Sequence, residues 1–423
     1  MKNIRFVSIL LLMGIVAACA APKQATPAPT PTPTPFTVLG TLHPGDKVGE
    51  MTLESAVSKS YYWLYDACNI NWAIQPASQT VKCTVPELAV VGIGDLWGAE
   101  TAKFEATWEQ MTWELYVDDY QVALDEFGYF DLSYYDPRAG FDVTYRNWNV
   151  LLKNLTAGKH SLRFSFTVAS EMNDGWDTYP PGKYEYIIDL TVTEKPVYAT
   201  LPPIPQPGQH AYASQNGSLD FLLYVPESYD SDPEKKWPLI VYLHDAEWRG
   251  SLDFVLRESL PQRLQTLKDF EFLVLTPAGN GDMDFWSAEE MIIPVIGVLD
   301  EIMALYPVDS SRIYLTGAGM GGNGVWAIGM RNPEYFAALA PLGGYIYPFG
   351  IPENICNLTD IPIWALHGEE DFMVPPQVEQ DLVDAVNACG GAAQFTVKPG
   401  AVIPLEVYFN SELFDWFLSH SKK

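Results

Sequence analysis

Positively charged residues are scarce in this sequence. It has 25 Lys and Arg against 53 Asp and Glu in 423 residues, which gives a formal net charge of -28 at pH 7. A chain of this charge repels phosphate backbones and anionic lipid surfaces, so we expect no nucleic-acid partner and no broad membrane-docking face. Hydrophobic residues nevertheless make up 48% of the chain, enough to build large cores.

Metal-binding patterns are also missing. The sequence contains no CxxC and no HxxxH spacing, and its six histidines are widely scattered, at positions 43, 160, 210, 244, 367 and 420. Cysteine and histidine pairs at short spacing are what tetrahedral metal sites require. We therefore expect no metal and no other cofactor.

A signal peptide is predicted at the N-terminus. Lys2 and Arg5 precede the apolar run 6–16, which is too short to span a membrane and is followed by small residues. The sequence VAAC at 16–19 resembles a bacterial lipobox, so residues 1–18 are predicted to be removed and Cys19 to carry lipid. The alternative is plain secretion with cleavage near Ala18. Both interpretations export the protein, and the first anchors it as an extracytoplasmic or cell-surface lipoprotein.

Four further cysteines remain in the exported part, an even number that suggests two disulfide bonds in an oxidising compartment. Proximity in the sequence favours Cys68 with Cys83 and Cys356 with Cys389, although spacing alone does not determine connectivity.

The N-terminal half is predicted to be all-β. Residues 19–36 alternate Pro and Thr, a composition that favours an extended linker. Within the following domain, 37–195, the segments 113–119, 161–168 and 184–192 alternate apolar and polar residues as half-buried strands do. Strands separated by turns, without a long helix, predict a β-sandwich of immunoglobulin-like type.

The C-terminal half is predicted to be α/β. A proline-rich linker, 196–209, precedes residues 210–423, in which apolar strand-like runs alternate with helical stretches. This alternation indicates a mainly parallel sheet covered by helices on both faces. The expected strands are 219–225, 238–243, 270–276, 312–316, 337–341, 361–366 and 394–397, and one expected helix covers 251–267.

A glycine-rich turn follows the strand at 312–316. It reads Gly317-Ala-Gly-Met-Gly-Gly322 and leads into a helix, which is the setting of a nucleophile elbow, G-x-S-x-G. The serine position holds Gly319. Phosphate binding is the alternative for such a turn, but neither Walker spacing nor G-x-G-x-x-G is present.

Further stretches extend this likeness over about half the chain. They read LYVPESY at 223–229, KWPLIVYLH at 236–244, YPVD at 306–309, RIYLTG at 312–317, MGG at 320–322, NPEYFAA at 332–338 and HGEEDFMVP at 367–375. In this order they resemble bacterial esterases of the α/β-hydrolase superfamily, in the branch near polyhydroxybutyrate depolymerases and feruloyl esterases. Some of these relatives carry an immunoglobulin-like N-terminal domain.

The resemblance implies a degenerate catalytic triad. Gly319 stands where the nucleophilic serine is expected and, without a side chain, cannot form an acyl-enzyme. Asp371 matches the acid, but Ala401 or Val402 stands where the histidine is expected, and none of the six histidines is placed to replace it. Without an imidazole to orient, Asp371 is more simply a turn or helix-cap carboxylate.

The resemblance also implies an altered oxyanion hole. In these esterases the loop after His244 reads H-G-x-G-E-R-G, whereas this chain has HDAEWRG at 244–250. The oxyanion-hole positions therefore correspond to Asp245, Ala246 and Met320, and the new acidic residues Asp245 and Glu247 would repel a developing oxyanion.

Three functions fit these observations. The first is a binding protein whose former cleft, lined by His244, Trp248 and Trp286, holds a carbohydrate or ester-like ligand or a protein partner without hydrolysing it. The second is an ester hydrolase of non-standard mechanism, in which Asp245, Glu247 or Asp371 activates water. The third is a structural scaffold at the cell surface. The oligomeric state does not follow from the sequence.

Overall fold

The computed structural model describes residues 37–55, 64, 68, 70, 73–93, 96–136, 139–148, 150–229, 234–248, 251–267, 270–279, 285–346, 350–371 and 373–422. The predicted signal peptide (1–18), Cys19 and the Pro/Thr linker (19–36) lie outside these residues. In the described part of the chain, no helix combines the length and apolar character needed to cross a bilayer.

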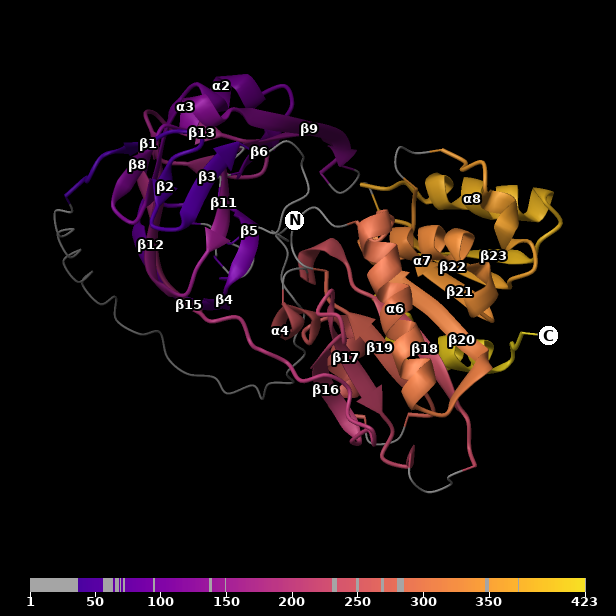
Figure 1. Cartoon of the computed structure of the whole chain (residues 1–423). Helices are drawn as coiled ribbons and strands as arrows, with labels where there is room; N and C mark the ends of the chain where they lie inside the picture. Colours follow the sequence, from indigo (N-terminus) through magenta and orange to yellow (C-terminus); the bar gives the residue numbers. More distant parts are fainter. Residues whose placement is uncertain are drawn as a thin grey trace, which may run out of the picture. The chain divides into compact units, whose positions relative to one another are not determined.

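Residues 41–193 contribute strands to mostly antiparallel sheets (Figure 1). The largest sheet has the order β1-β8-β7-β12-β15-β4, and β6-β10-β9, β2-β3-β11-β5 and β13-β14 form smaller ones. The strands are β1 (Thr41–Leu42), β2 (Lys47–Val48), β3 (Met51–Ser55), β4 (Ser78–Pro86), β5 (Leu88–Gly92), β6 (Leu96–Glu100), β7 (Met111–Val117), β8 (Tyr120–Val122), β9 (Tyr129–Asp136), β10 (Phe141–Trp148), β11 (Val150–Leu155), β12 (Gly158–Val168), β13 (Met172–Asn173), β14 (Thr178–Tyr179) and β15 (Gly182–Thr193).

These sheets share one hydrophobic core. Side chains at alternate positions point into it, for example Phe164 and Phe166 of β12 and Tyr184 and Tyr186 of β15, and their rings stack in pairs. The helices described here are short, α2 (Phe104–Trp108) and α3 (Leu124–Phe127). Layered strands around a common apolar core agree with an all-β domain. The immunoglobulin-like type and the domain boundaries remain predictions.

An eight-stranded sheet organises the C-terminal half (Figure 1). Its order is β16-β17-β19-β18-β20-β21-β22-β23, with β17 antiparallel to both neighbours and the strands from β19 to β23 parallel. Its strands are β16 (Gly208–Ala213), β17 (Asp220–Val225), β18 (Trp237–Leu243), β19 (Leu273–Pro277), β20 (Val308–Ala318), β21 (Ala338–Leu342), β22 (Ile363–Gly368) and β23 (Ala393–Lys398). This is the strand order of the α/β-hydrolase fold, as the sequence predicts.

Helices cover both faces of this sheet. Every residue of β18 is buried, and alternate residues belong to different cores: Leu239 and Val241 pack with α6, α7 and α8, whereas Ile240 and Tyr242 pack with α5 and α9. A strand covered on both faces reads as a continuous apolar run, which explains the sequence signal. The helices are η2 (Ala246–Trp248), α4 (Leu252–Val255), α5 (Ser259–Leu264), α6 (Glu289–Leu305), α7 (Met320–Arg331), η3 (Pro333–Tyr335), η4 (Ile355–Leu358), α8 (Pro376–Ala388), η5 (Leu405–Phe409) and α9 (Glu412–Leu418).

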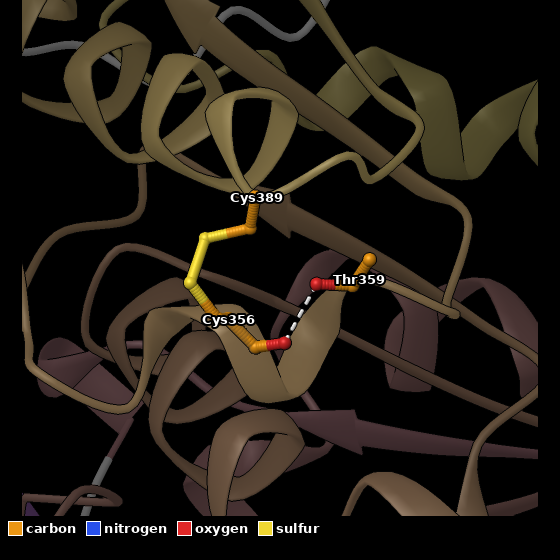
Figure 2. The surroundings of a disulfide bond; sticks show 3 residues. All are labelled: Cys356, Thr359 and Cys389. Atoms are coloured by element: carbon orange, nitrogen blue, oxygen red, sulfur yellow. Dashed lines mark hydrogen bonds between the residues drawn. A yellow bond between two sulfur atoms is a disulfide. The ribbon is translucent and has the colours of Figure 1, made fainter.

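Both predicted disulfide bonds are present. Cys68 pairs with Cys83 in the β-rich half. Cys356 of η4 pairs with Cys389, which directly follows α8 (Figure 2). The hydroxyl of Thr359 donates a hydrogen bond to the Cys356 carbonyl oxygen, with an oxygen–oxygen distance of 2.7 Å. Disulfide bonds persist in oxidising compartments, so the pairing is consistent with an extracellular protein.

Candidate active site

The turn between β20 and α7 has the backbone of a nucleophile elbow. Gly319 lies at its apex with φ 52° and ψ -110°, a conformation in which a side chain is strained. Gly317 and Gly321 on either side are required for space, because a Cβ on either would come within 2.6 Å of the Leu243 carbonyl oxygen. The turn is therefore built against the end of β18, and its apex carries no side chain.

The carboxylate of Asp245 occupies the space beside this apex. A Cβ on Gly319 would lie 2.3 Å from Asp245 Oδ1 and 2.5 Å from Oδ2. Asp245 Oδ1 accepts hydrogen bonds from the backbone N–H of Met320 at 2.8 Å and of Ala246 at 2.6 Å. In α/β-hydrolases the N–H after the nucleophile and an N–H of this loop form the oxyanion hole. The three residues assigned to that hole from the sequence are therefore in contact here.

The loop that carries Asp245 is held by buried contacts. The backbone N–H of Asp245 donates to Glu258 Oε1 at 3.0 Å, and Glu258 is only 1% exposed. His244 Nδ1 faces the Asp245 carbonyl oxygen at 2.8 Å, and His244 Nε2 faces the Gly279 N–H at 3.0 Å. Because a carbonyl only accepts and an amide only donates, the proton sits on Nδ1 and His244 is the neutral tautomer. Its ring has a structural role.

Two of the residues predicted to line a ligand cleft do not reach the surface. His244 and Trp286 are completely buried, and the Trp286 indole donates to the His244 carbonyl oxygen at 2.9 Å. Side chains enclosed in this way cannot contact a ligand, so the prediction does not hold for these two. Trp248, in η2, is partly exposed and remains the candidate of the three.

Asp371 follows β22 and is engaged within its own turn. Its Oδ1 accepts from the N–H groups of Met373 and Val374 at 3.0 and 2.9 Å, and its Oδ2 lies 3.4 Å from His367 Nε2. A carboxylate that accepts successive N–H groups stabilises a turn. This arrangement gives Asp371 a structural use that needs no catalytic histidine.

A buried ion pair that the sequence reasoning did not identify lies next to Asp371. His367 and Glu379 are completely buried, and His367 Nδ1 lies 2.7 Å from Glu379 Oε2 while its Nε2 donates to the Val374 carbonyl oxygen. Burial lowers the pKa of His367, but hydrogen bonds to Asp371 and Glu379 outweigh it and raise the pKa to about 10. Burial raises the pKa of Glu379 to about 7, against the hydrogen bonds from His367 and the Trp326 indole.

The loop in which a catalytic histidine is expected carries only apolar side chains. The carbonyl oxygens of Ala401 and Val402 would lie 2.2 and 2.1 Å from a Cβ on Gly368, so this backbone packs against the end of β22. The neighbouring Ile403 packs beside Gly343, close to Asp371: a Cβ on Gly343 would be 3.4 Å from Ile403 Cγ1 and 3.8 Å from Asp371 Oδ2. An aliphatic side chain therefore lies near the acid.

Every histidine of the chain has its ring engaged elsewhere. Besides His244 and His367, the ring partners are the Glu126 carboxylate for His43, Asp118 and the Thr156 carbonyl for His160, the Pro207 carbonyl for His210, and the Trp416 carbonyl with Ser419 for His420. None of these contacts involves the turn at Gly319. Over the described residues, no three His, Cys, Asp or Glu side chains are grouped so that they could hold a metal ion.

The strand order and this turn define a domain of the α/β-hydrolase type. The sequence matches no known family profile. It is 26% identical over 98 residues to a Salmonella typhimurium protein provisionally named carboxymethylenebutenolidase, covering 22% of this chain and 36% of that protein. It is 24% identical over 164 residues to a bifunctional acetylxylan esterase/xylanase of Neocallimastix patriciarum, covering 37% of this chain and 22% of that protein. The chain thus spans only about a third and a fifth of these two relatives.

The likeness to solved structures is also of low sequence identity. One, a thermostable esterase, is 19% identical and covers 81% of this chain and 99% of its own, with a TM-score of 0.42. A likeness at this level adds nothing to what the strand order already shows. The names of these curated relatives support an esterase-like or dienelactone-hydrolase-like α/β-hydrolase.

Proposed function

We propose that this chain is an exported, lipid-anchored α/β-hydrolase homologue that binds a ligand or partner instead of hydrolysing esters. Two relatives carry esterase or lactone-hydrolase names, and the sheet and elbow needed for such chemistry are present. The groups that would perform the chemistry are not. The ligand class that we favour is carbohydrate, since one relative is named as an acetylxylan esterase/xylanase.

The observation that carries this proposal is the bare apex at Gly319. Acyl transfer by a serine hydrolase requires a nucleophile at this point and an imidazole that takes its proton. In subtilisin, loss of the serine or the histidine alone lowers turnover by about 10⁶-fold. Here the apex has no side chain, and each of the six imidazoles is engaged away from it.

The contacts of the carboxylates do not favour the alternative function, an ester hydrolase in which a carboxylate activates water. Asp245 Oδ1 already accepts two N–H groups, and Asp371 bonds two N–H groups of its own turn and approaches His367. Both carboxylates are therefore already engaged as acceptors of backbone N–H groups. The side chain of Glu247 lies outside the described residues.

Turnover of an aryl ester tests the proposal. With p-nitrophenyl acetate, the purified protein should release nitrophenol no faster than the Asp371→Asn variant does, because Asp371 has no catalytic partner. A wild-type rate that Asp371→Asn abolishes would show a working acid and refute the loss of activity.

Equilibrium binding tests the second half of the proposal. Isothermal titration with xylo-oligosaccharides should give a saturable heat, and Trp248→Ala should weaken it if the ligand lies at the loop after β18. If a glycan and aryl-ester panel gives no saturable binding and the protein instead purifies in a stable hetero-complex, the scaffold function replaces this one.

A further inference from the structure

We propose that Asp245 is a built-in occupant that keeps a carboxylate-binding site closed at the turn between β20 and α7. The inference deepens the proposed function and rests on it, since it concerns the same turn and the loop after β18. It adds a second block, independent of the missing serine and histidine, and it names the ligand chemistry that this block excludes.

The site is formed by donors from two different elements. The N–H of Met320 belongs to the first turn of α7, a helix of 12 residues, whereas the N–H of Ala246 belongs to η2, which follows β18. Both donate to the same oxygen, Asp245 Oδ1, at 2.8 and 2.6 Å. Two amides that converge on one oxygen are the arrangement that stabilises a developing oxyanion during acyl transfer. Both donors are therefore present in a chain that has no side chain at position 319.

The missing side chain at Gly319 is what lets Asp245 enter. All three carboxyl atoms of Asp245 lie within 2.5 Å of the point where a Cβ at position 319 would be. A Cβ atom does not approach non-bonded atoms so closely, so a serine at 319 and this rotamer of Asp245 exclude one another. The loss of the nucleophile and the position of Asp245 are therefore linked in space.

The contact is more than a helix cap. A capping carboxylate needs only the free N–H groups of the helix end, and Met320 would provide these. The second donor, Ala246, lies on the loop of Asp245 itself, and the Glu258 carboxylate holds the backbone of Asp245 from behind at 3.0 Å. The loop is thus fixed so that its carboxylate fills the hole. An ester carbonyl or a free carboxylate that approaches this point finds its donors taken and a negative charge in its place.

The test uses the full-length protein, benzoate as the probe, and the amide resonances of Met320 and Ala246 as the readout. Asp245→Gly removes the occupant, and Asp245→Ala is a second variant should the first fail to fold. Asp245→Asn is the matched control, because its amide oxygen can still accept both N–H groups. Benzamide is the uncharged control ligand.

We expect benzoate to bind Asp245→Gly or Asp245→Ala at least tenfold more tightly than wild type or Asp245→Asn, and to shift both amide resonances. For benzamide, no variant should show a tenfold increase in affinity over wild type. Equal benzoate affinity in wild type and Asp245→Gly would overturn the inference, as would binding that leaves both amides unshifted or a failure of both opened variants to bind.

A measurement on unmodified protein keeps the inference falsifiable if every variant misfolds. In wild type the Met320 and Ala246 amide resonances should move together with the carboxyl carbon of Asp245 as pH is lowered, and amides that titrate independently of it would contradict the contact. Ester turnover by wild type would sink the proposed function but leave these benzoate and titration results standing, so the two failures can be told apart.

Discussion

Gly319 and Asp245 share a single space at the elbow. The glycine adopts φ 52° without strain, and the volume it leaves is filled by the Asp245 carboxylate. A serine hydrolase would hold a hydroxyl there and leave the oxyanion donors open. At the scale of residues, the bare glycine and the carboxylate of Asp245 therefore fit one another at this turn.

This fit predicts how Gly319→Ala behaves. A side chain in this backbone region costs about 1–3 kcal/mol in strain. The overlap with Asp245 adds about 1–3 kcal/mol of overpacking. In urea unfolding, Gly319→Ala should lose stability relative to wild type through both the backbone strain and the overlap with Asp245. When the same substitution is made in the Asp245→Gly variant, only the loss from backbone strain should remain. Additive effects of the two substitutions would show that they do not share the space.

The buried pair His367–Glu379 predicts a second coupling. Replacing His367 with Gln leaves the Glu379 carboxylate buried without a cation, which costs about 3–5 kcal/mol. The double variant His367→Gln, Glu379→Gln removes both charges and should recover much of that loss. Urea unfolding of the two single variants and the double variant gives the coupling energy. A double variant that is less stable than His367→Gln alone would contradict the ion pair.

The same pair predicts a pH dependence. The pKa of His367 is raised from 6.5 to about 10 in the folded protein, so the fold holds a proton that the unfolded chain releases. Its stabilisation is complete below about pH 6.5 and is lost as the pH rises through about 10. Stability of wild type should fall between these values more steeply than that of the double variant. If the stability of wild type and of the double variant changed with pH in parallel, the raised pKa of His367 would be contradicted.

The glycine at position 319 could be read from the sequence, but the position of Asp245 could not. A glycine in place of serine is visible in the motif at 317–322, and six histidines can be checked individually. In contrast, Asp245 and Met320 are 75 positions apart, and only the fold brings the carboxylate to the helix end. The sequence indicates that Asp245 adds charge near the hole, but its insertion into the hole depends on how the fold places β18 beside α7.

At the scale of elements, strands covered on both faces were the easiest to predict. Every expected strand of the C-terminal half corresponds to one of β17 to β23. Most of these strands are almost completely buried, and burial on both faces gives a continuous apolar run. The edge strand β23 is only partly buried. The edge strand β16, Gly208–Ala213, was missed and partly assigned to the linker. Most of its residues are only partly buried, so its sequence lacks that apolar run.

One expected helix, 251–267, is divided in two. The side chain of Ser251 caps α4 by accepting from the Asp253 N–H, and α5 begins at Ser259 with Pro261 in its first turn. A proline has no N–H to donate and its ring clashes with the carbonyl four residues earlier, so a continuous helix through 257–261 is disfavoured. The pattern of apolar residues alone does not reveal this interruption.

The disulfide bond between η4 and α8 predicts a loss of stability on reduction. Cys356 and Cys389 close a loop across 33 positions, and a loop closed by a disulfide restricts the unfolded chain. The free energy of unfolding of the variant Cys356→Ser, Cys389→Ser should be about 2–4 kcal/mol lower than that of wild type. Dithiothreitol should destabilise wild type more than this variant, which retains only Cys68–Cys83. Equal sensitivity would show that the bridge does not stabilise the fold.

For the whole molecule, the two disulfide bonds are consistent with an exported protein, and the lipid anchor remains a prediction. Cys19 lies in a lipobox-like sequence and both disulfide bonds suit an oxidising compartment. Substitution Cys19→Ser should move the protein from the membrane fraction to the soluble exported fraction, and labelled palmitate should enter wild type only. Membrane association that survives this substitution would exclude Cys19 as the anchor.

The mass of the intact protein after exposure to a fluorophosphonate is the most direct test of the central claim. The reagent adds irreversibly to activated serine nucleophiles of hydrolases, so a chain with a bare elbow offers it no attachment point there. We expect an unchanged mass for wild type. An adduct that maps to the peptide containing Gly319 and Met320 would contradict it.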